Sequence, residues 1–145
     1  MQTRKGMGNS HADLLSGFDW NSVDTVVDIG GGHGTTSMDI VKNTVSTRCV
    51  VQDLPNVIEG AKEPVSPELD NRISFMGHDF FMEQPVKEAD VYFFRWILHD
   101  WSDDRASLIL RNLIPALKPG ANIVLQEMIM PEPGTMPFFH EKNLR

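Results

Sequence analysis

Five short apolar runs along the chain have the composition of buried β-strands. They are rich in β-branched or aromatic residues, and several are apolar on successive positions, which is typical of strands covered on both faces. The runs occupy residues 25–29, 48–51, 72–76, 90–94 and 122–126. Segments that can form helices separate them, so the sequence predicts an α/β fold with a mostly parallel sheet. Ligands of such sheets bind beyond the carboxyl ends of the strands.

The clearest helix is predicted over residues 103–117. Its apolar positions recur at helical spacing, at Ala106, Ile109, Leu110, Leu113, Ile114 and Leu117. Ser102 is a suitable N-cap, and Pro115 is expected to loosen the last turn before Lys-Pro-Gly, residues 118–120, ends the helix. Residues 62–70 contain two prolines and are expected to form a loop inside the domain.

Length and composition fit one globular domain. The chain has 145 residues, of which 41% are hydrophobic and 23% charged, enough for one core and too few for a second domain. We assign residues 1–16 to a polar N-terminal segment and residues 17–145 to the domain.

Charge and cysteine usage exclude several classes of function. The net charge of −7 opposes binding to nucleic acid or to an anionic membrane, because both depend on clustered lysine and arginine. Cys49 is the single cysteine, so an internal disulfide is impossible and a reducing compartment is favoured. The chain shows no signal-peptide pattern and no apolar run of about 18 residues, so we expect a soluble, cytoplasmic protein.

The stretch DIGGGHG, residues 28–34, follows the first predicted strand and is the most informative in the chain. Glycines are required where a backbone turns sharply from strand to helix and lets a ligand approach closely. Thr35 stands where the dinucleotide fingerprint needs its third glycine, which disfavours a hydride-transferring oxidoreductase, and the lysine of a P-loop is absent. The remaining pattern, with Asp28 ahead of three alternate glycines, suits a nucleoside that carries an ammonium group and no phosphates. S-Adenosylmethionine is such a ligand.

Acidic residues follow the next two predicted strands. Asp53 comes about 20 residues after the glycine stretch, a spacing at which an acid accepts hydrogen bonds from ribose hydroxyls. Asp79 can accept from the adenine amino group, and Phe80 can lie against the adenine face. Each of the three, taken alone, is equally well explained as a cap or a core residue. Together with the glycine stretch they favour a nucleoside site.

His99 and Glu127 are the candidate catalytic pair. His99 follows the fourth predicted strand and Glu127 ends the fifth, so neighbouring strands would bring both to one cleft. Methyl transfer from a sulfonium is fastest to an oxyanion. Histidine, with a pKa near 6.5, can take the acceptor's proton while a carboxylate orients its ring. Trp96 and Trp101 fit core positions better than ligand contacts.

The remaining histidines and acids have no assigned role. The acids at positions 100, 103 and 104 are better explained by the start of a helix than by a metal ion, so we expect no metal site. The histidines at positions 11, 33, 78 and 140 have no partner at a clear spacing.

Several motifs, in this order, resemble the plant and fungal type of S-adenosylmethionine-dependent O-methyltransferases, the caffeic-acid and flavonoid O-methyltransferase class. They are VVDIGGGHG, VVQDLPNVIEGA, GHDFF, RWILHDWSDD, NLIPALKPGANIVLQEMIMPEPGT and HEKNLR. The sequences of these motifs are most similar to those of fungal family members that act in secondary metabolism. The resemblance implies a Rossmann-like class I methyltransferase fold with sheet order 3-2-1-4-5-7-6. It also implies methyl transfer to a hydroxyl, expected to be phenolic, of a small secondary metabolite.

The resemblance also assigns individual residues. It makes His99 the proton acceptor and Glu127 the acid beside it. Arg95, where plant members usually carry lysine, would contact the cofactor. Asp53 would contact the ribose, and the adenine would meet Asp79 and Phe80. The methionine part would be lined by Gly30, Gly31, Gly32 and Gly34.

The sequence also departs from that family. By that resemblance, we expect this sequence to be without two parts of the family: the N-terminal helical domain, which drives dimerisation and closes part of the acceptor pocket, and the last two strands. We therefore expect about five strands, the fifth being an unpaired apolar edge through which the chain could form a homo- or hetero-oligomer. The alternative to an active enzyme is a noncatalytic remnant that binds S-adenosylmethionine or docks on another methyltransferase chain.

Overall fold

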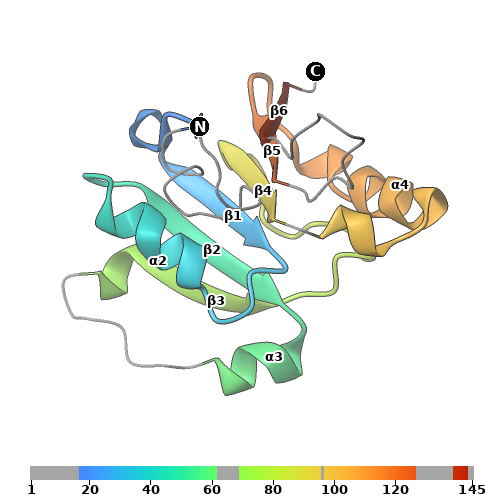
Figure 1. The fold of residues 1–145 in the computed structure, drawn as a ribbon, viewed down its shortest axis with the longest axis horizontal. Helices are drawn as coiled ribbons and strands as arrows, with labels where there is room; N and C mark the ends of the chain where they lie inside the picture. Colours follow the sequence, from blue (N-terminus) through green and yellow to red (C-terminus); the bar gives the residue numbers. More distant parts are fainter. Residues whose placement is uncertain (1–16, 62–68, 96, 127–138, 144–145) are drawn as a thin grey trace, which may run out of the picture.

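The computed structural model contains a six-stranded sheet with helices on both faces (Figure 1). It describes residues 17–61, 69–95, 97–126 and 139–143. The strands are β1 (Thr25–Ile29), β2 (Arg48–Asp53), β3 (Ile73–Gly77), β4 (Val91–Arg95), β5 (Asn122–Gln126) and β6 (Phe139–Asn143). The helices are α2 (Thr35–Lys42), α3 (Pro55–Gly60) and α4 (Asp103–Arg111). Short 3-10 turns are η1 (Trp20–Ser22), η2 (Asp70–Arg72), η3 (Leu98–Asp100) and η4 (Ile114–Ala116).

The strand order is β3-β2-β1-β4-β5-β6, and the first five strands are parallel. The predicted parallel sheet and its 3-2-1-4-5 order are therefore confirmed. The first and fifth predicted runs match β1 and β5, whereas the other three strands extend one or two residues further toward their carboxyl ends than predicted. This difference makes Asp53 and Arg95 the last residues of β2 and β4.

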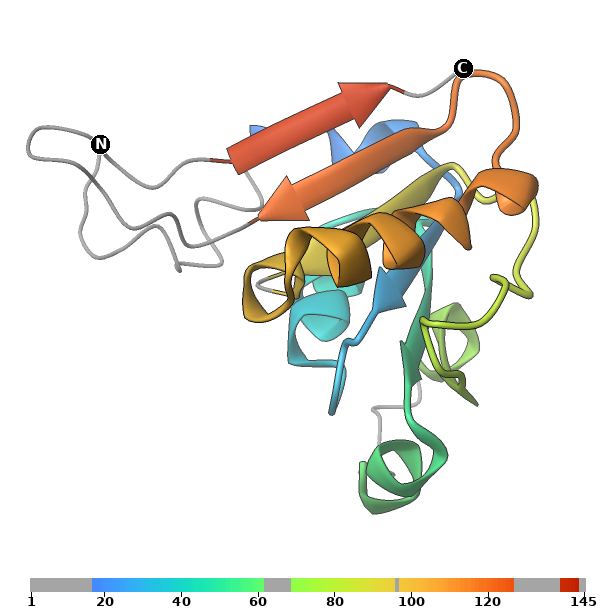
Figure 2. The same cartoon turned by 90° about the vertical axis from the view of Figure 1, so that its right-hand side faces the viewer.

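Strand β6 corrects the prediction of an unpaired fifth strand. It runs antiparallel to β5, with Gln126 opposite Phe139 and Asn122 opposite Asn143, and Figure 2 shows the two strands side by side. Its sequence, FHEKN, has no apolar run and so gave no strand signal. The outermost strands of the described sheet are β3 and β6, and the expected oligomer through an open β5 edge loses its basis.

Two hydrophobic clusters cover the two faces of the sheet. Successive strand residues alternate between them, as the period of a strand requires: Val26 and Phe93 face one side, and Val27 and Phe94 face the other. Helix α2 closes the first cluster with Ile40 and Val41, and α4 closes the second with Ile109, joined by Leu113 just before η4. Figure 1 shows these helices on opposite sides of the sheet. Because the helices cover both faces of the sheet, a ligand site is expected at the loops that follow the carboxyl ends of the parallel strands.

Helix α4 begins as predicted and ends earlier. The Ser102 hydroxyl accepts a hydrogen bond from the Arg105 N–H at 3.3 Å, which confirms the N-cap. The helix ends at Arg111 instead of residue 117, because Pro115 has no N–H to donate to the Arg111 carbonyl. Asn112 turns instead toward the loop after β3. Its side-chain amide donates to the Phe81 carbonyl at 2.7 Å, and its own carbonyl accepts from the Gln84 N–H at 3.0 Å.

Some predictions concern residues outside the described part of the chain. These are the polar segment over residues 1–16 and most of the predicted loop over 62–70, of which the structure describes Leu69 in a turn and Asp70 at the start of η2. Among the helices in the described ranges, none has both the length and the apolar character that a membrane span needs.

Candidate functional site

The glycine loop between β1 and α2 is held in a compact turn at the carboxyl edge of the sheet. The Gly31 N–H donates to the Gln52 carbonyl at 2.9 Å, and the Gly34 N–H donates to the Gly31 carbonyl at 3.0 Å. Gly34 caps α2 with φ +81°, a left-handed conformation, and an added Cβ there would lie 3.1 Å from the Phe75 ring. The loop is therefore fixed both by its own turn and by β2.

Asp28 lies buried directly beneath this loop. An added Cβ at Gly31 would come within 2.6 Å of the Asp28 carboxyl carbon, so only glycine allows this approach. The Ser37 hydroxyl donates to the Asp28 carboxylate at 2.7 Å. Burial raises the pKa of Asp28 to about 6, although the Ser37 hydrogen bond and the charge of Arg95 oppose the rise. The carboxylate therefore supports the loop from below.

We expect Asp28→Asn to change how stability depends on pH. Burial raises the folded-state pKa of Asp28 from 3.8 to about 6, so the folded state binds a proton here more tightly than the unfolded state does. The resulting stabilisation is complete at a pH below the unfolded-state pKa. This contribution is lost as the pH rises through the folded-state pKa, and the loss amounts to about 3 kcal/mol. Asparagine keeps the acceptor for Ser37 and does not ionise. Urea unfolding should therefore show the variant gaining stability relative to the unaltered chain between pH 4 and pH 7.

Glu59→Gln, which removes the same charge from an exposed position of α3, is the matched control and should show no such trend. A stability difference between Asp28→Asn and the unaltered chain that stays constant with pH would contradict the assigned pKa.

Asp53 connects the end of β2 to the glycine loop. One carboxylate oxygen accepts from the Gly32 N–H at 3.0 Å, and the other accepts from the Leu54 N–H at 2.8 Å. A carboxylate has about four acceptor positions, so both oxygens keep capacity for a further donor such as a hydroxyl. An added Cβ at Gly32 would meet no atom within 4 Å, so this part of the loop faces open space.

A pocket of about 230 Å³ opens beside Asp53, somewhat smaller than the usual small-molecule site. The structure brings three of the predicted ligand residues, Asp53, Asp79 and Phe80, to its wall. Asp79 also shapes the loop after β3, since its carboxylate accepts from the Phe81 N–H at 2.9 Å. Phe80 reaches back to the glycine loop, with a ring carbon 3.5 Å from an added Cβ at Gly30. The pocket and the loop therefore form one site.

Four further residues line the pocket that sequence reasoning did not assign to it: Leu54, His78, Phe81 and Trp101. Trp101 is 39% exposed, so its interpretation as a core residue is wrong. Its ring packs edge-to-face with Phe81 at a centroid distance of 4.9 Å and with Phe80 at 6.2 Å. Nothing in the spacing along the chain predicts this contact, because it joins loops that follow different strands.

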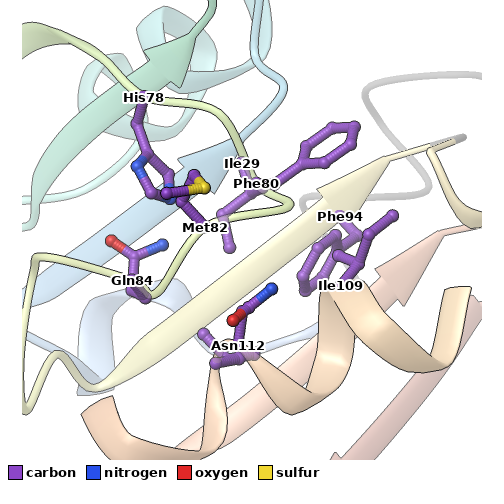
Figure 3. A pocket seen from close by; sticks show the side chains of 9 residues that line it. Ile29, His78, Phe80, Met82, Gln84, Phe94, Ile109 and Asn112 are labelled. Carbon is purple, nitrogen blue, oxygen red and sulfur yellow. The ribbon is translucent and has the colours of Figure 1, made fainter. Parts of the chain in front are cut away.

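His78 lines both the pocket and a much smaller cavity of about 10 Å³, which is space for about one water molecule. Figure 3 shows His78, Gln84 and Asn112 among the side chains around this cavity. Burial lowers the pKa of His78, although the charge of Asp79 opposes the shift. A lowered pKa favours the neutral imidazole, in which one nitrogen is a donor and the other an acceptor.

Arg95 lies at the carboxyl end of β4, near Asp28, and does not line the pocket. Its Nε donates to the Gln126 side-chain oxygen at 2.9 Å. Burial lowers the pKa of Arg95, and the charge of Asp28 opposes this shift. The predicted contact between Arg95 and a cofactor stays a prediction.

The candidate catalytic pair is described only in part. Strands β4 and β5 are neighbours, as the pairing of His99 with Glu127 requires. The backbone of His99 forms the middle of η3, at the same edge of the sheet as the glycine loop. Its side chain, like the whole of Glu127, lies outside the described part of the structure, so both roles stay predictions. In the described ranges, no three His, Cys, Asp or Glu side chains cluster as a metal site would require.

Comparisons with known proteins identify the family. The chain matches the O-methyltransferase domain over residues 3–142, and it belongs to this family. It is 46% identical to a grayanic acid biosynthesis cluster O-methyltransferase of Cladonia grayi over 95% of this chain and 31% of that protein. It is also 46% identical to a chlorophenol O-methyltransferase of Trichoderma longibrachiatum, over 97% of this chain and 31% of that protein. The chain thus spans about a third of the length of these relatives.

A solved structure shares the fold. Human N-acetylserotonin methyltransferase in complex with S-adenosylmethionine superposes with a TM-score of 0.71 at 32% identity, over 79% of this chain and 32% of that chain. The Rossmann-like class I methyltransferase fold predicted from the sequence is therefore confirmed.

Proposed function

We propose that the chain is the S-adenosylmethionine-binding part of an O-methyltransferase that methylates a phenolic hydroxyl of a small secondary metabolite. The observation that carries the proposal is the contact between the Gly32 N–H and the carboxylate of Asp53, which lines the pocket. It joins an acceptor suited to ribose hydroxyls to a glycine loop that faces open space. The names of the relatives support the same reaction.

The residues present fit S-adenosylmethionine. Asp53 would accept from the ribose hydroxyls, and Asp79 with Phe80 would hold the adenine. The loop from Gly30 to Gly34 would lie along the methionine part, with the negative charge of Asp28 beneath a ligand that carries a sulfonium and an ammonium group. When bound, S-adenosylmethionine supplies an activated methyl group on its positively charged sulfur.

The remaining chemistry falls to the protein's own side chains. A phenol, with a pKa near 10, is a poor nucleophile until it loses its proton. His99 accepts the proton of the acceptor hydroxyl, and the oxyanion that remains takes the methyl group. Glu127 would fix the orientation of the imidazole and stabilise its protonated form.

Calorimetric titration with S-adenosylhomocysteine tests the proposed binding. The unaltered chain should bind, and Asp53→Asn should weaken binding about 10- to 150-fold, since hydrogen bonds to a charged group contribute about 1.5–3 kcal/mol. Glu59→Gln is the matched control, because it removes the same charge from an exposed position and should bind normally.

Turnover separates the proposed enzyme from a noncatalytic alternative. A panel of phenols that includes chlorinated phenols, chosen because one relative is a chlorophenol O-methyltransferase, should contain an acceptor. Binding of S-adenosylhomocysteine without turnover on any acceptor would favour the remnant that binds S-adenosylmethionine or docks on another methyltransferase chain. Absence of binding would contradict the proposed enzyme and the remnant that binds S-adenosylmethionine, and would leave only the chain that docks on another methyltransferase.

A further inference from the structure

Two buried glutamines join strand β2 to the loop after β3. Gln52 is 1% exposed and Gln84 is 3% exposed. The Gln52 Nε2 donates to the Gln84 Oε1 at 2.7 Å, and the Gln84 Nε2 donates to the Gln52 Oε1 at 2.9 Å. A buried amide is costly unless it is hydrogen-bonded, and here the two side-chain amides satisfy one another.

Gln52 also holds the glycine loop through its backbone. Its carbonyl accepts from the Gly31 N–H at 2.9 Å, and Asp53 follows it directly as the last residue of β2. The Asp53 carbonyl in turn accepts from the His78 N–H at 2.8 Å, where the loop after β3 begins. Gln52 therefore lies where the glycine loop, Asp53 and the loop after β3 meet.

Gln84 fixes the far end of the same loop. Its side-chain oxygen also accepts from the Val86 N–H at 3.0 Å, and its backbone N–H donates to the Asn112 carbonyl at 3.0 Å. Figure 3 shows the Gln84 and Asn112 side chains around the same small cavity. Gln84 thus attaches the loop both to β2, through Gln52, and to the end of α4.

The loop held in this way carries Asp79 and Phe80, which share the pocket with Asp53. A buried hydrogen-bonded pair adds little stability over two apolar groups of the same shape. Hydrogen bonds are directional, however, whereas apolar contacts are not. What the amide pair adds is therefore a defined position of the loop relative to β2.

We infer that Gln52 and Gln84 are positioning residues. Their amide pair holds the loop over residues 78–84 at the distance from Asp53 that an adenosyl group spanning both requires. The inference rests on the proposed function, since it takes Asp53 and Asp79 as contacts of that group. Both glutamines lie behind the residues that line the pocket, so they act through the loop and not on the ligand.

Calorimetry with S-adenosylhomocysteine, together with urea unfolding, tests the pair. Gln84→Met keeps a side chain of similar length and leaves the buried Gln52 amide without its partner amide. It should lower the urea midpoint. It should also weaken binding about 2- to 30-fold, the effect expected of a residue that acts on a site without touching the ligand. Gln52→Met should have the same two effects.

The double variant Gln52→Met/Gln84→Met separates positioning from stability. Because both amides are replaced, neither is left buried without its partner, and the urea midpoint should return toward that of the unaltered chain. The affinity for S-adenosylhomocysteine should stay low, because apolar contact does not restore the position of the loop. An affinity that returns together with the urea midpoint would mean that the pair is merely structural, and would overturn the inference.

Thr47→Val is the matched control. Thr47 is buried just before the amino end of β2, and its hydroxyl donates to the Trp20 carbonyl at 2.8 Å. The variant removes a buried hydrogen bond at the opposite end of the same strand. It should therefore lower the urea midpoint and leave the affinity for S-adenosylhomocysteine unchanged. A comparable loss of affinity in Thr47→Val would show that affinity follows stability and would contradict the positioning role.

Adenosine shows which contacts the loop controls. Gln84→Met should weaken binding of adenosine by about the same factor as binding of S-adenosylhomocysteine, because the loop carries the proposed adenine contacts. A loss confined to S-adenosylhomocysteine would place the effect at the methionine part and overturn the inference. If the unaltered chain binds and neither single variant changes its affinity, the inference fails while the proposed function stands. If the unaltered chain does not bind, the proposed function fails first and the inference with it.

Discussion

Replacing His99 with asparagine should slow methyl transfer to a phenol by about 10²- to 10⁴-fold, the usual contribution of a general base. The affinity for S-adenosylhomocysteine should not change, because the base acts on the acceptor and not on the cofactor. Single-turnover rates and calorimetry on the same preparation measure the two effects separately.

The acidity of the acceptor provides the internal control for this prediction. A phenol that is already ionised at the pH of the assay needs no base, so the defect of His99→Asn should shrink as the pKa of the acceptor falls. It should also shrink as the pH rises toward the pKa of the phenol. A defect of the same size for all phenols would mean that His99 positions the acceptor and does not take its proton.

Replacing Gly31 with alanine should destabilise the fold by about 1–3 kcal/mol, as overpacking of a filled site does. The added Cβ would lie 2.6 to 2.9 Å from three atoms of the Asp28 carboxyl group, and Asp28 cannot yield because it is buried and bound to Ser37. The glycine loop must therefore move, and binding of S-adenosylhomocysteine should weaken with it. Urea unfolding and calorimetry measure the two effects.

Gly60→Ala provides the matched control, since an added Cβ at Gly60 meets no atom within 4 Å. It should be neutral or should stabilise the fold by up to about 1 kcal/mol, because Gly60 lies in α3. A double-mutant cycle with Asp28→Ala identifies the cause: the cost of Gly31→Ala should fall when the carboxyl group is absent. If the losses in the free energy of unfolding caused by Gly31→Ala and Asp28→Ala simply add, the clash of the new Cβ is not with the Asp28 carboxyl group.

The centre of the parallel sheet could be predicted because β1, β4 and β5 are largely buried on both faces and therefore read as nearly continuous apolar runs. Strand β6 could not, because FHEKN has the composition of an exposed segment and forms a strand only by pairing with β5. The apolar spacing along the chain also predicts too late an end for helix α4. Apolar spacing continues to residue 117, whereas Pro115 and the contacts of Asn112 with the loop after β3 end the helix at Arg111.

Within the site, sequence reasoning found residues whose role follows from their position at the end of a strand. Asp53 ends β2, and Asp79 and Phe80 come after the neighbouring β3; such positions converge by topology alone. Trp101 belongs to the same pocket through the packing of its ring against Phe80 and Phe81, which no linear spacing encodes. His78 follows β3 directly, so its position at the end of a strand gave the same signal as that of Asp79, and sequence reasoning overlooked it because it has no partner at a clear spacing.

The most direct test of the account is a crystal structure of the chain with S-adenosylhomocysteine. We expect the ribose hydroxyls on the Asp53 carboxylate, the adenine beside Asp79 and Phe80, and the sulfur beside the glycine loop. The His99 imidazole should face the same cavity as the sulfur. A ligand bound elsewhere, or an imidazole directed to the other side of the sheet, would contradict the proposed methyl transfer.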